Sequence, residues 1–170
     1  MVWLTGLSGA GKSTLAHELR NRLLVSGTPS VVLDGDRIRS SLCSDLGFEP
    51  QDRRENVRRV AELAKLVLES GHIAIVALIS PTRDDRQLAR RIIGAPNFVE
   101  VYCECPLEIC EGRDVKGLYR LARSGGISQF TGISAPYEPP LEPEVVLNTA
   151  ASGLPECAGK LLSFIHARYG

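Results

Sequence analysis

The sequence lacks an excess of charge of either sign. Among its 170 residues, 20 Lys and Arg are balanced by 20 Asp and Glu, so the formal net charge is zero. A general nucleic-acid-binding protein needs a basic excess to neutralise phosphates, and this balance argues against that class. Any anionic ligand must instead be held by a local cluster of residues, which indicates a small molecule.

Long apolar runs are missing as well. No stretch reaches the roughly 18 apolar residues that suggest a membrane span, and no basic-then-apolar leader precedes the first expected strand. Five cysteines occur at spacings that match neither a zinc site nor a redox C-x-x-C pair, and an odd number cannot all pair within one chain. We therefore expect a cytoplasmic protein with reduced, mostly buried thiols and with neither membrane nor nucleic acid as a partner.

Short β-branched runs alternate with longer helical patterns, which is typical of stacked βαβ units in a single domain over residues 1–170. The runs are almost continuously apolar, so we expect parallel strands covered on both faces. The predicted strands are Val2–Thr5, Val31–Asp34, Ile73–Ile79, Phe98–Cys103 and Val145–Leu147. The predicted helices are Ser13–Val25, Arg54–Ser70, Asp84–Ile93 and Leu154–Arg168.

The phosphate-binding pattern G-x-x-x-x-G-K-[ST] follows the first expected strand. It is complete in Gly6, Leu7, Ser8, Gly9, Ala10, Gly11, Lys12, Ser13 and Thr14. The glycines let successive backbone N–H groups point at phosphate oxygens, and the next helix adds its positive end. Lys12 is then expected to reach the β- and γ-phosphates, and the Ser13 hydroxyl to bind Mg²⁺. The alternative is a glycine-rich turn that merely carries a lysine, but it leaves the complete pattern unexplained.

The phosphate loop fits ATP or GTP together with Mg²⁺. No apolar strand ends in the D-x-x-G pattern of Ras-type GTPases, and their N-K-x-D pattern is absent. Residues 112–143 break the alternation of strands and helices and are rich in Gly, Pro, Arg and Tyr. A segment this long without regular pattern is usually a functional lid or disordered, and its basic residues favour a lid over an anionic ligand. The predicted fold is a three-layer α/β/α P-loop NTPase fold with a mainly parallel sheet of about five strands and this lid.

Asp34 ends the second predicted strand and Asp36 follows it, at the edge where open α/β sheets place their ligands. One carboxylate is suited to orient or deprotonate an acceptor hydroxyl, and the other to bind metal-linked water. The alternative is that Asp36 caps a short helix while Arg37 and Arg39 are solvated. The local sequence leaves both interpretations open.

Several strings beyond the phosphate loop closely resemble the adenylyl-sulfate kinase (APS kinase) family. They include D-G-D (residues 34–36), F-T-G-I (130–133) and, most distinctive, D-V-K-G-L-Y (114–119) and Y-E-P-P (137–140). The similarity extends over residues 3–147. Arg37 and Thr82 depart from it, because Asn and Tyr are expected at these positions. The resemblance implies transfer of the ATP γ-phosphoryl group to the ribose 3′-hydroxyl of adenylyl sulfate, which gives 3′-phosphoadenylyl sulfate (PAPS) and ADP in sulfate assimilation.

The resemblance also implies the acceptor site. The positions that match family contacts to adenylyl sulfate are Asp36, Arg39, Phe48, Arg53, Asn56, Ile79, Ser80, Lys116 and Phe130. Guanidinium groups suit the phosphosulfate anion, and Arg58 is a third candidate beside Arg39 and Arg53. Phe48 and Phe130 are expected to sandwich the adenine, with simple core packing as the alternative.

The expected catalytic residues are Lys12, Asp34, Asp36 and Ser80. Asp34 is the candidate for positioning the 3′-hydroxyl. The serine that matches Ser80 is often described in the family as a phosphoserine intermediate. Ser80 followed by Pro81 also looks like a helix N-cap, and direct in-line transfer needs no covalent intermediate.

The resemblance suggests a homodimer, and the start close to the phosphate loop suggests a domain that is fused to, or works with, the ATP sulfurylase that makes adenylyl sulfate. Two other functions stay open from the residues. One is a related P-loop kinase for a sugar acid or nucleoside, which a substrate panel would separate. The other is a non-catalytic nucleotide-binding domain, which would bind ATP without transferring phosphate.

Overall fold

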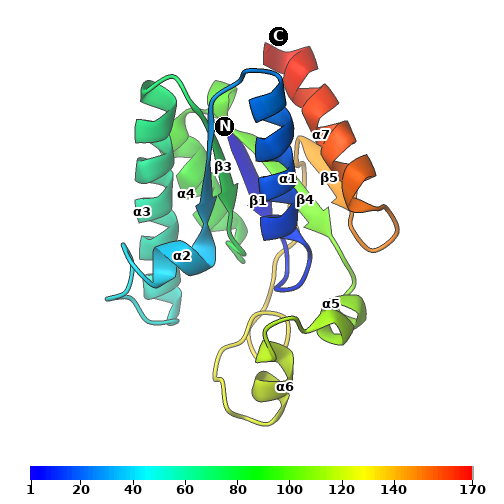
Figure 1. Cartoon of the computed structure of the whole chain (residues 1–170). Coiled ribbons are helices and arrows are strands. Elements are labelled where there is room, and N and C mark those ends of the chain that lie inside the picture. The colour runs from blue at the N-terminus through cyan, green and yellow to red at the C-terminus, as the bar shows by residue number, and fades with distance from the viewer. Residues whose placement is uncertain (170) are drawn as a thin grey trace.

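A computed structural model describes residues 1–169 and contains a five-stranded parallel sheet between two layers of helices (Figure 1). The strands follow the order β2-β3-β1-β4-β5, and every neighbouring pair is parallel. Their bounds are β1 (Val2–Thr5), β2 (Ser30–Asp34), β3 (Ile73–Ala77), β4 (Val99–Glu104) and β5 (Val145–Asn148). The predicted α/β fold class is confirmed.

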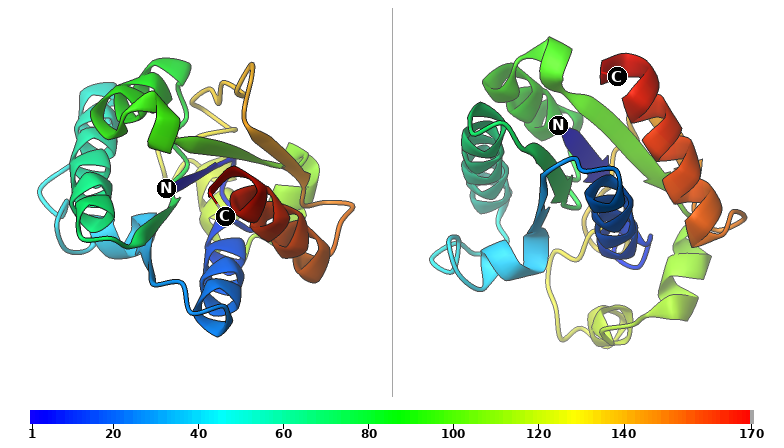
Figure 2. Two further views of the ribbon diagram at one scale, coloured as in Figure 1. Left: turned by 90° about the horizontal axis from the view of Figure 1, so that it is seen from above. Right: turned by 45° about the horizontal axis from the view of Figure 1, so that its top comes forward.

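Helices α1 (Lys12–Val25) and α7 (Leu154–Tyr169) cover one face of the sheet, and α3 (Pro50–Glu69) and α4 (Arg83–Ile93) cover the other (Figure 2). Four shorter helical segments lie in the connections: α2 (Gly35–Arg39), the 3₁₀ turn η1 (Ala95–Asn97), α5 (Leu107–Arg113) and α6 (Leu118–Arg123). None of the helices described for residues 1–169 is both long and apolar enough to cross a membrane.

The central strand β1 contributes to both halves of the core. Val2 and Leu4 pack in the cluster beneath α1 and α7, whereas Trp3 is fully buried in the cluster beneath α3 and α4. This alternation follows from the two-residue period of a strand. Because all strands are parallel, their carboxyl ends meet at one edge of the sheet, from which α2, α5 and α6 follow (Figure 1).

The predicted boundaries are close to the observed ones, with two informative differences. The strand predicted to reach Ile79 ends at Ala77, and the helix predicted from Arg54 begins at Pro50. Proline needs no N–H partner in the first turn of a helix, so Pro50 is well placed there. The predicted lid, residues 112–143, contains α6, which its composition did not reveal. All five cysteines are free and buried, as predicted.

Two leucines of α1 provide a test of how this helix packs against the core. Leu19 is fully buried, whereas Leu24 is 64% exposed. Replacing Leu19 by Ala leaves a cavity, so we expect Leu19→Ala to lower the free energy of unfolding by about 2–5 kcal/mol. Leu24→Ala removes a leucine side chain from the surface and should change the free energy of unfolding by about 0.5 kcal/mol or less. Urea denaturation followed by circular dichroism measures both, and equal losses would contradict this packing of α1.

Candidate functional site

A cleft of about 1050 Å³ opens at the carboxyl edge of the sheet. The phosphate loop lines it through Ser8, Gly9, Gly11, Lys12, Ser13 and Thr14. All the predicted acceptor positions line the same cleft: Asp36, Arg39, Phe48, Arg53, Asn56, Ile79, Ser80, Lys116 and Phe130. The structure therefore brings together residues that are spread over more than 120 positions of the sequence.

The phosphate loop needs glycine where it turns against α5 and β4. Gly6 has φ of 149°, and a Cβ there would lie 2.6 Å from the Cys103 carbonyl oxygen. Gly9 has φ of 77°, in the left-handed region, with the Cys110 carbonyl oxygen 3.0 Å from its Cβ position. Gly6, Leu7 and Ala10 do not line the cleft, and Ala10 is fully buried beneath it. These three residues shape the loop from behind.

Lys12 is the first residue of α1 and is largely buried. Its ammonium donates hydrogen bonds to the carbonyl oxygens of Gly6, at 2.9 Å, and Leu7, at 2.7 Å. Burial lowers the pKa of Lys12 to about 8, because the charged form loses solvation. The loop's own carbonyls thus hold the cation at the place where phosphate oxygens are expected.

Asp34 ends β2 and caps α2. Its Oδ1 accepts a hydrogen bond from the Asp36 backbone N–H at 3.0 Å, and its Oδ2 accepts one from the Ser13 hydroxyl at 2.5 Å. The alternative in which Asp36 caps the helix is therefore wrong, because Asp36 lies in the first turn and leaves the N-cap position to Asp34. The strand end places a carboxylate directly beside the expected metal ligand.

Asp36 points in another direction. It forms an ion pair with Lys116, which lies between α5 and α6, and the two side chains are 69% and 52% exposed. This pair connects the predicted lid to α2 across the cleft. Because both groups are solvated, the pair itself adds little stability.

The guanidinium groups of Arg39 and Arg53 meet at Phe48. Arg39 Cζ lies 4.6 Å from the centre of the Phe48 ring, and Arg53 Nε donates to the Phe48 carbonyl oxygen at 2.7 Å. Arg53 also donates to Thr131 Oγ1 at 2.8 Å and to the Gln129 carbonyl oxygen. Partial burial lowers the pKa of each arginine, yet a guanidinium stays charged at neutral pH.

Arg58 does not join this group. It pairs with Glu55 at 2.8 Å on the outer side of α3, and it does not line the cleft. The prediction that Arg58 is a candidate for the anion is therefore wrong. The helical period places Arg53 and Asn56 on the cleft side of α3 and turns Arg58 away.

The two phenylalanines differ in burial. Phe48 is 60% exposed, whereas Phe130 is 9% exposed and packs edge-on against Tyr119 with ring centres 5.0 Å apart. Phe130 therefore belongs to the hydrophobic core and also lines the cleft.

Asn56 is 2% exposed, and its Oδ1 has no hydrogen-bond partner among the described residues.

Ser80 is 1% exposed and has φ of 41°, an uncommon conformation for a residue with a side chain. Its hydroxyl oxygen accepts a hydrogen bond from Trp3 Nε1 at 3.0 Å. Ser80 is not the N-cap of the next helix, so that alternative is wrong. Thr82 has this role, because α4 begins only at Arg83 and Thr82 Oγ1 accepts from the Asp85 N–H at 3.2 Å.

Sequence reasoning missed the other end of the cleft. Residues 149–154 line it together with Arg113 and Cys157. Arg113 donates to the Gly9 carbonyl oxygen at 3.1 Å and to the Thr149 carbonyl oxygen at 2.7 Å, and so joins this loop to the phosphate loop. The loop contains small and turn-forming residues without a motif, and only the pairing of β5 with β4 brings it here.

Comparisons with known proteins agree on one family. The sequence matches the family described as adenylylsulphate kinase over residues 1–148. It is 52% identical over 168 residues to the adenylyl-sulfate kinase of Acaryochloris marina, which covers 99% of this chain and 82% of that protein.

Two solved structures of APS kinases are similar to this chain as well. The Mycobacterium tuberculosis APS kinase CysC in complex with AMPPNP and APS superimposes with a TM-score of 0.94 at 43% identity, covering 97% of this chain and 96% of that one. A hexameric APS kinase from Thiobacillus denitrificans gives a TM-score of 0.73 at 34% identity, covering 99% of this chain and 29% of that one. With a phosphate loop and the predicted acceptor residues lining one cleft, this chain belongs to the adenylyl-sulfate kinase family.

Proposed function

We propose that this protein transfers the γ-phosphoryl group of ATP to the ribose 3′-hydroxyl of adenylyl sulfate, giving 3′-phosphoadenylyl sulfate and ADP. The observation that carries the proposal is the shared cleft. Its phosphate loop suits the donor, and its opposite wall has cations and aromatic rings that suit a sulfated nucleotide. Membership of the family supports this assignment over a sugar kinase or a non-catalytic domain.

Lys12 and the loop N–H groups bind the donor phosphates in this proposal. The hard oxygens of Ser13 and Asp34 lie 2.5 Å apart, and one hydroxyl with one carboxylate fits Mg²⁺, which in such sites keeps phosphate and water ligands as well. These two residues would hold the ion, directly or through water, and the ion would neutralise charge on the β- and γ-phosphates.

Asp34 positions the 3′-hydroxyl, because it lies one hydrogen bond from Ser13 and thus nearest the transferred group. Asp36 and Lys116 contact the acceptor nucleotide nearer to the solvent. A loose phosphoryl-transfer transition state needs orientation and charge neutralisation more than a strong base. Lys12, Arg39 and Arg53 supply the positive charge.

Ser80 serves as a structural residue and not as a phosphoryl carrier. Its hydroxyl accepts a hydrogen bond from Trp3 Nε1 and lies 3.4 Å from the Leu78 carbonyl oxygen, and no basic side chain among the described residues is bonded to it. Direct transfer between two ligands bound in one cleft is sufficient. A homodimer, a cytoplasmic location and a link to ATP sulfurylase stay predictions.

The direct test is incubation of the purified protein with ATP, Mg²⁺ and adenylyl sulfate, with mass spectrometry of the products. We expect 3′-phosphoadenylyl sulfate and ADP in equal amounts. A panel of sugar acids and nucleosides serves as the control. ATP binding without transfer to adenylyl sulfate, or preferential transfer to a panel member, would refute the proposed function.

The exposed ring of Phe48 provides a test of the acceptor wall. Stacking on a base contributes about 1–3 kcal/mol, so Phe48→Ala should raise KM for adenylyl sulfate about tenfold. Its free energy of unfolding should change by about 0.5 kcal/mol or less, because the ring is 60% exposed. Phe130→Ala should raise KM similarly but also cost about 3–5 kcal/mol of stability.

Leu42→Ala is the matched control for Phe48→Ala, since Leu42 is 51% exposed and does not line the cleft. Steady-state kinetics and urea denaturation on all three variants give the comparison. If Phe48→Ala behaves like Leu42→Ala, Phe48 does not contact the acceptor.

The depressed pKa of Lys12 predicts a pH dependence of nucleotide binding. The ammonium is charged below pH 8 and becomes neutral as the pH rises through its pKa of about 8. Bound phosphate favours the charged form, so the Kd for ATP should rise above about pH 8, by up to about tenfold per pH unit. Isothermal calorimetry between about pH 7 and 9.5 measures this change.

Lys12→Arg is the control, because a guanidinium stays charged over this range. This variant should bind ATP more weakly, with a Kd that does not rise with pH. A flat profile for the unmodified protein would show that the Lys12 ammonium is not the titrating group that binds phosphate.

A further inference from the structure

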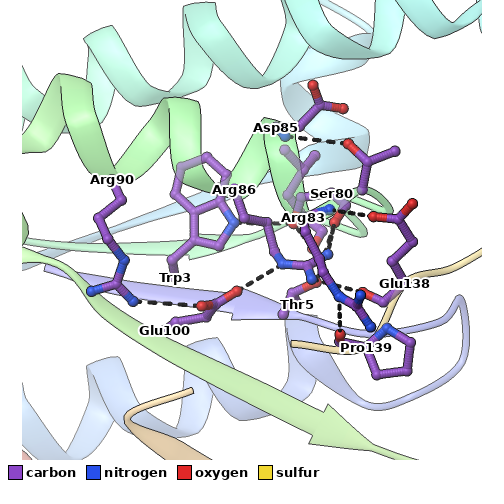
Figure 3. A network of polar contacts seen from close by, with 12 residues as sticks. Trp3, Thr5, Ser80, Arg83, Asp85, Arg86, Arg90, Glu100, Glu138 and Pro139 are labelled. Atoms are coloured by element: carbon purple, nitrogen blue, oxygen red, sulfur yellow. Dashed lines mark hydrogen bonds and ion pairs between the residues drawn. The ribbon is translucent and has the colours of Figure 1, made fainter. Parts of the chain in front are cut away.

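Arg86, in the first turns of α4, is a buried cation outside the cleft, and its side chain is 2% exposed. Its guanidinium makes three hydrogen bonds of 2.7 Å (Figure 3): Nε donates to Glu100 Oε1, Nη1 to the Ser80 carbonyl oxygen, and Nη2 to the Glu138 carbonyl oxygen. One side chain thus joins strand β4, the turn after β3 and the far end of the lid.

The turn after β3, residues 79–81, forms part of the acceptor wall of the cleft. Its centre is strained, since Ser80 has φ of 41°. Two buried donors hold its carbonyl groups: Arg86 binds that of Ser80, and Thr5 Oγ1 donates to that of Ile79 at 2.7 Å. Without these donors the strained backbone could adopt other conformations, and the cleft wall would lose its shape.

The end of the lid is bound to the same turn. The Glu138 backbone N–H donates to the Pro81 carbonyl oxygen at 2.8 Å, and Glu138 Oε2 accepts from the Arg83 backbone N–H at 2.8 Å. Tyr137 Oη lies 2.9 Å from Thr5 Oγ1. Because the single hydroxyl proton of Thr5 is given to Ile79, the Tyr137 hydroxyl is the donor in this contact.

We propose that Arg86 and Thr5 are positioning residues for acceptor recognition, which act through the backbone of Ile79 and Ser80. This inference rests on the proposed function, since it concerns the adenylyl-sulfate half of the same cleft. Neither residue lines the cleft or the phosphate positions. Their loss should therefore weaken acceptor binding while ATP binding stays close to normal.

Arg90 supplies a matched control. It lies one turn further along α4, and it shares Glu100 with Arg86 at 3.5 Å while pairing with Glu144 at 2.6 Å. Within residues 1–169, its side-chain hydrogen bonds reach Glu100 and Glu144 but neither Ser80 nor Glu138. A change at Arg90 thus disturbs the buried ion network but leaves the donors to the turn in place.

The first experiment compares Arg86→Lys with Arg90→Lys. Lysine keeps a positive charge beside Glu100 but lacks the planar guanidinium that donates to two carbonyl oxygens at once. For Arg86→Lys we expect KM for adenylyl sulfate to rise about tenfold, with KM for ATP changed by about twofold or less. Arg90→Lys should change both constants by about twofold or less. Equal effects of the two variants, or an equal rise for both substrates, would overturn the proposal.

A second pair keeps the proposal testable if Arg86→Lys folds poorly. Thr5→Val keeps the shape of the side chain and removes its hydroxyl, whereas Thr5→Ser keeps the hydroxyl. We expect Thr5→Val to show the acceptor-selective rise in KM and Thr5→Ser to restore values within about twofold of the unmodified protein. A Thr5→Val variant with unchanged KM for adenylyl sulfate would contradict the role of this donor.

Failure of the proposed function gives a different result. In that case the unmodified protein does not phosphorylate adenylyl sulfate at all, whereas failure of this inference leaves that activity intact. Calorimetric titration of adenylyl sulfate into the same variants measures the acceptor affinity independently of turnover. A loss in Arg86→Lys with no loss in Arg90→Lys supports the positioning role, and equal affinities reject it.

Discussion

The carboxyl end of β1 is the constraint on which both halves of the site depend. Thr5 ends the strand and its hydroxyl binds the Ile79 carbonyl of the acceptor wall, while the next residue, Gly6, begins the phosphate loop. Because β1 pairs with β3 on one side and β4 on the other, the turns that follow all three strands meet at this point. The strand order, and not any single motif, brings the proposed donor and acceptor walls to one cleft.

Although the net charge of the protein is zero, basic side chains gather where the ligands are expected. Lys12, Arg39, Arg53 and Lys116 line the cleft from four different segments. Away from the cleft, arginines are compensated by carboxylates, as in the buried Arg86–Glu100 and the half-buried Arg90–Glu144 pairs. A zero net charge is therefore compatible with a positive local site, because basic side chains outnumber the two acids that line the cleft, Asp36 and Asp114.

Much of the fold and the chemical class followed from sequence, because each rests on a local pattern. Apolar runs with β-branched residues predicted the strands, and the complete phosphate loop predicted the nucleotide site. What failed depended on tertiary contacts. The helix α6 inside the lid has no long periodicity, the cap roles at Asp34 and Thr82 depend on φ and ψ, and the loop at residues 149–154 reaches the cleft only through pairing of β5 with β4. Arg58 carries the same charge as Arg53 but lies on the outer side of α3.

The lid is attached by contacts of two kinds, and the difference has a physical consequence. Arg53 binds Thr131 and the Gln129 carbonyl, and Lys116 binds Asp36, with groups that also line the cleft. An anionic acceptor bound as proposed would therefore compete with lid contacts for the same N–H donors. At residues 137–139 the attachment uses Arg86, Arg83 and Thr5, of which none lines the cleft. A ligand in the cleft has no direct access to these groups, so we expect the end of the lid to stay attached to the turn after β3 even where a bound acceptor replaces contacts of the middle segment.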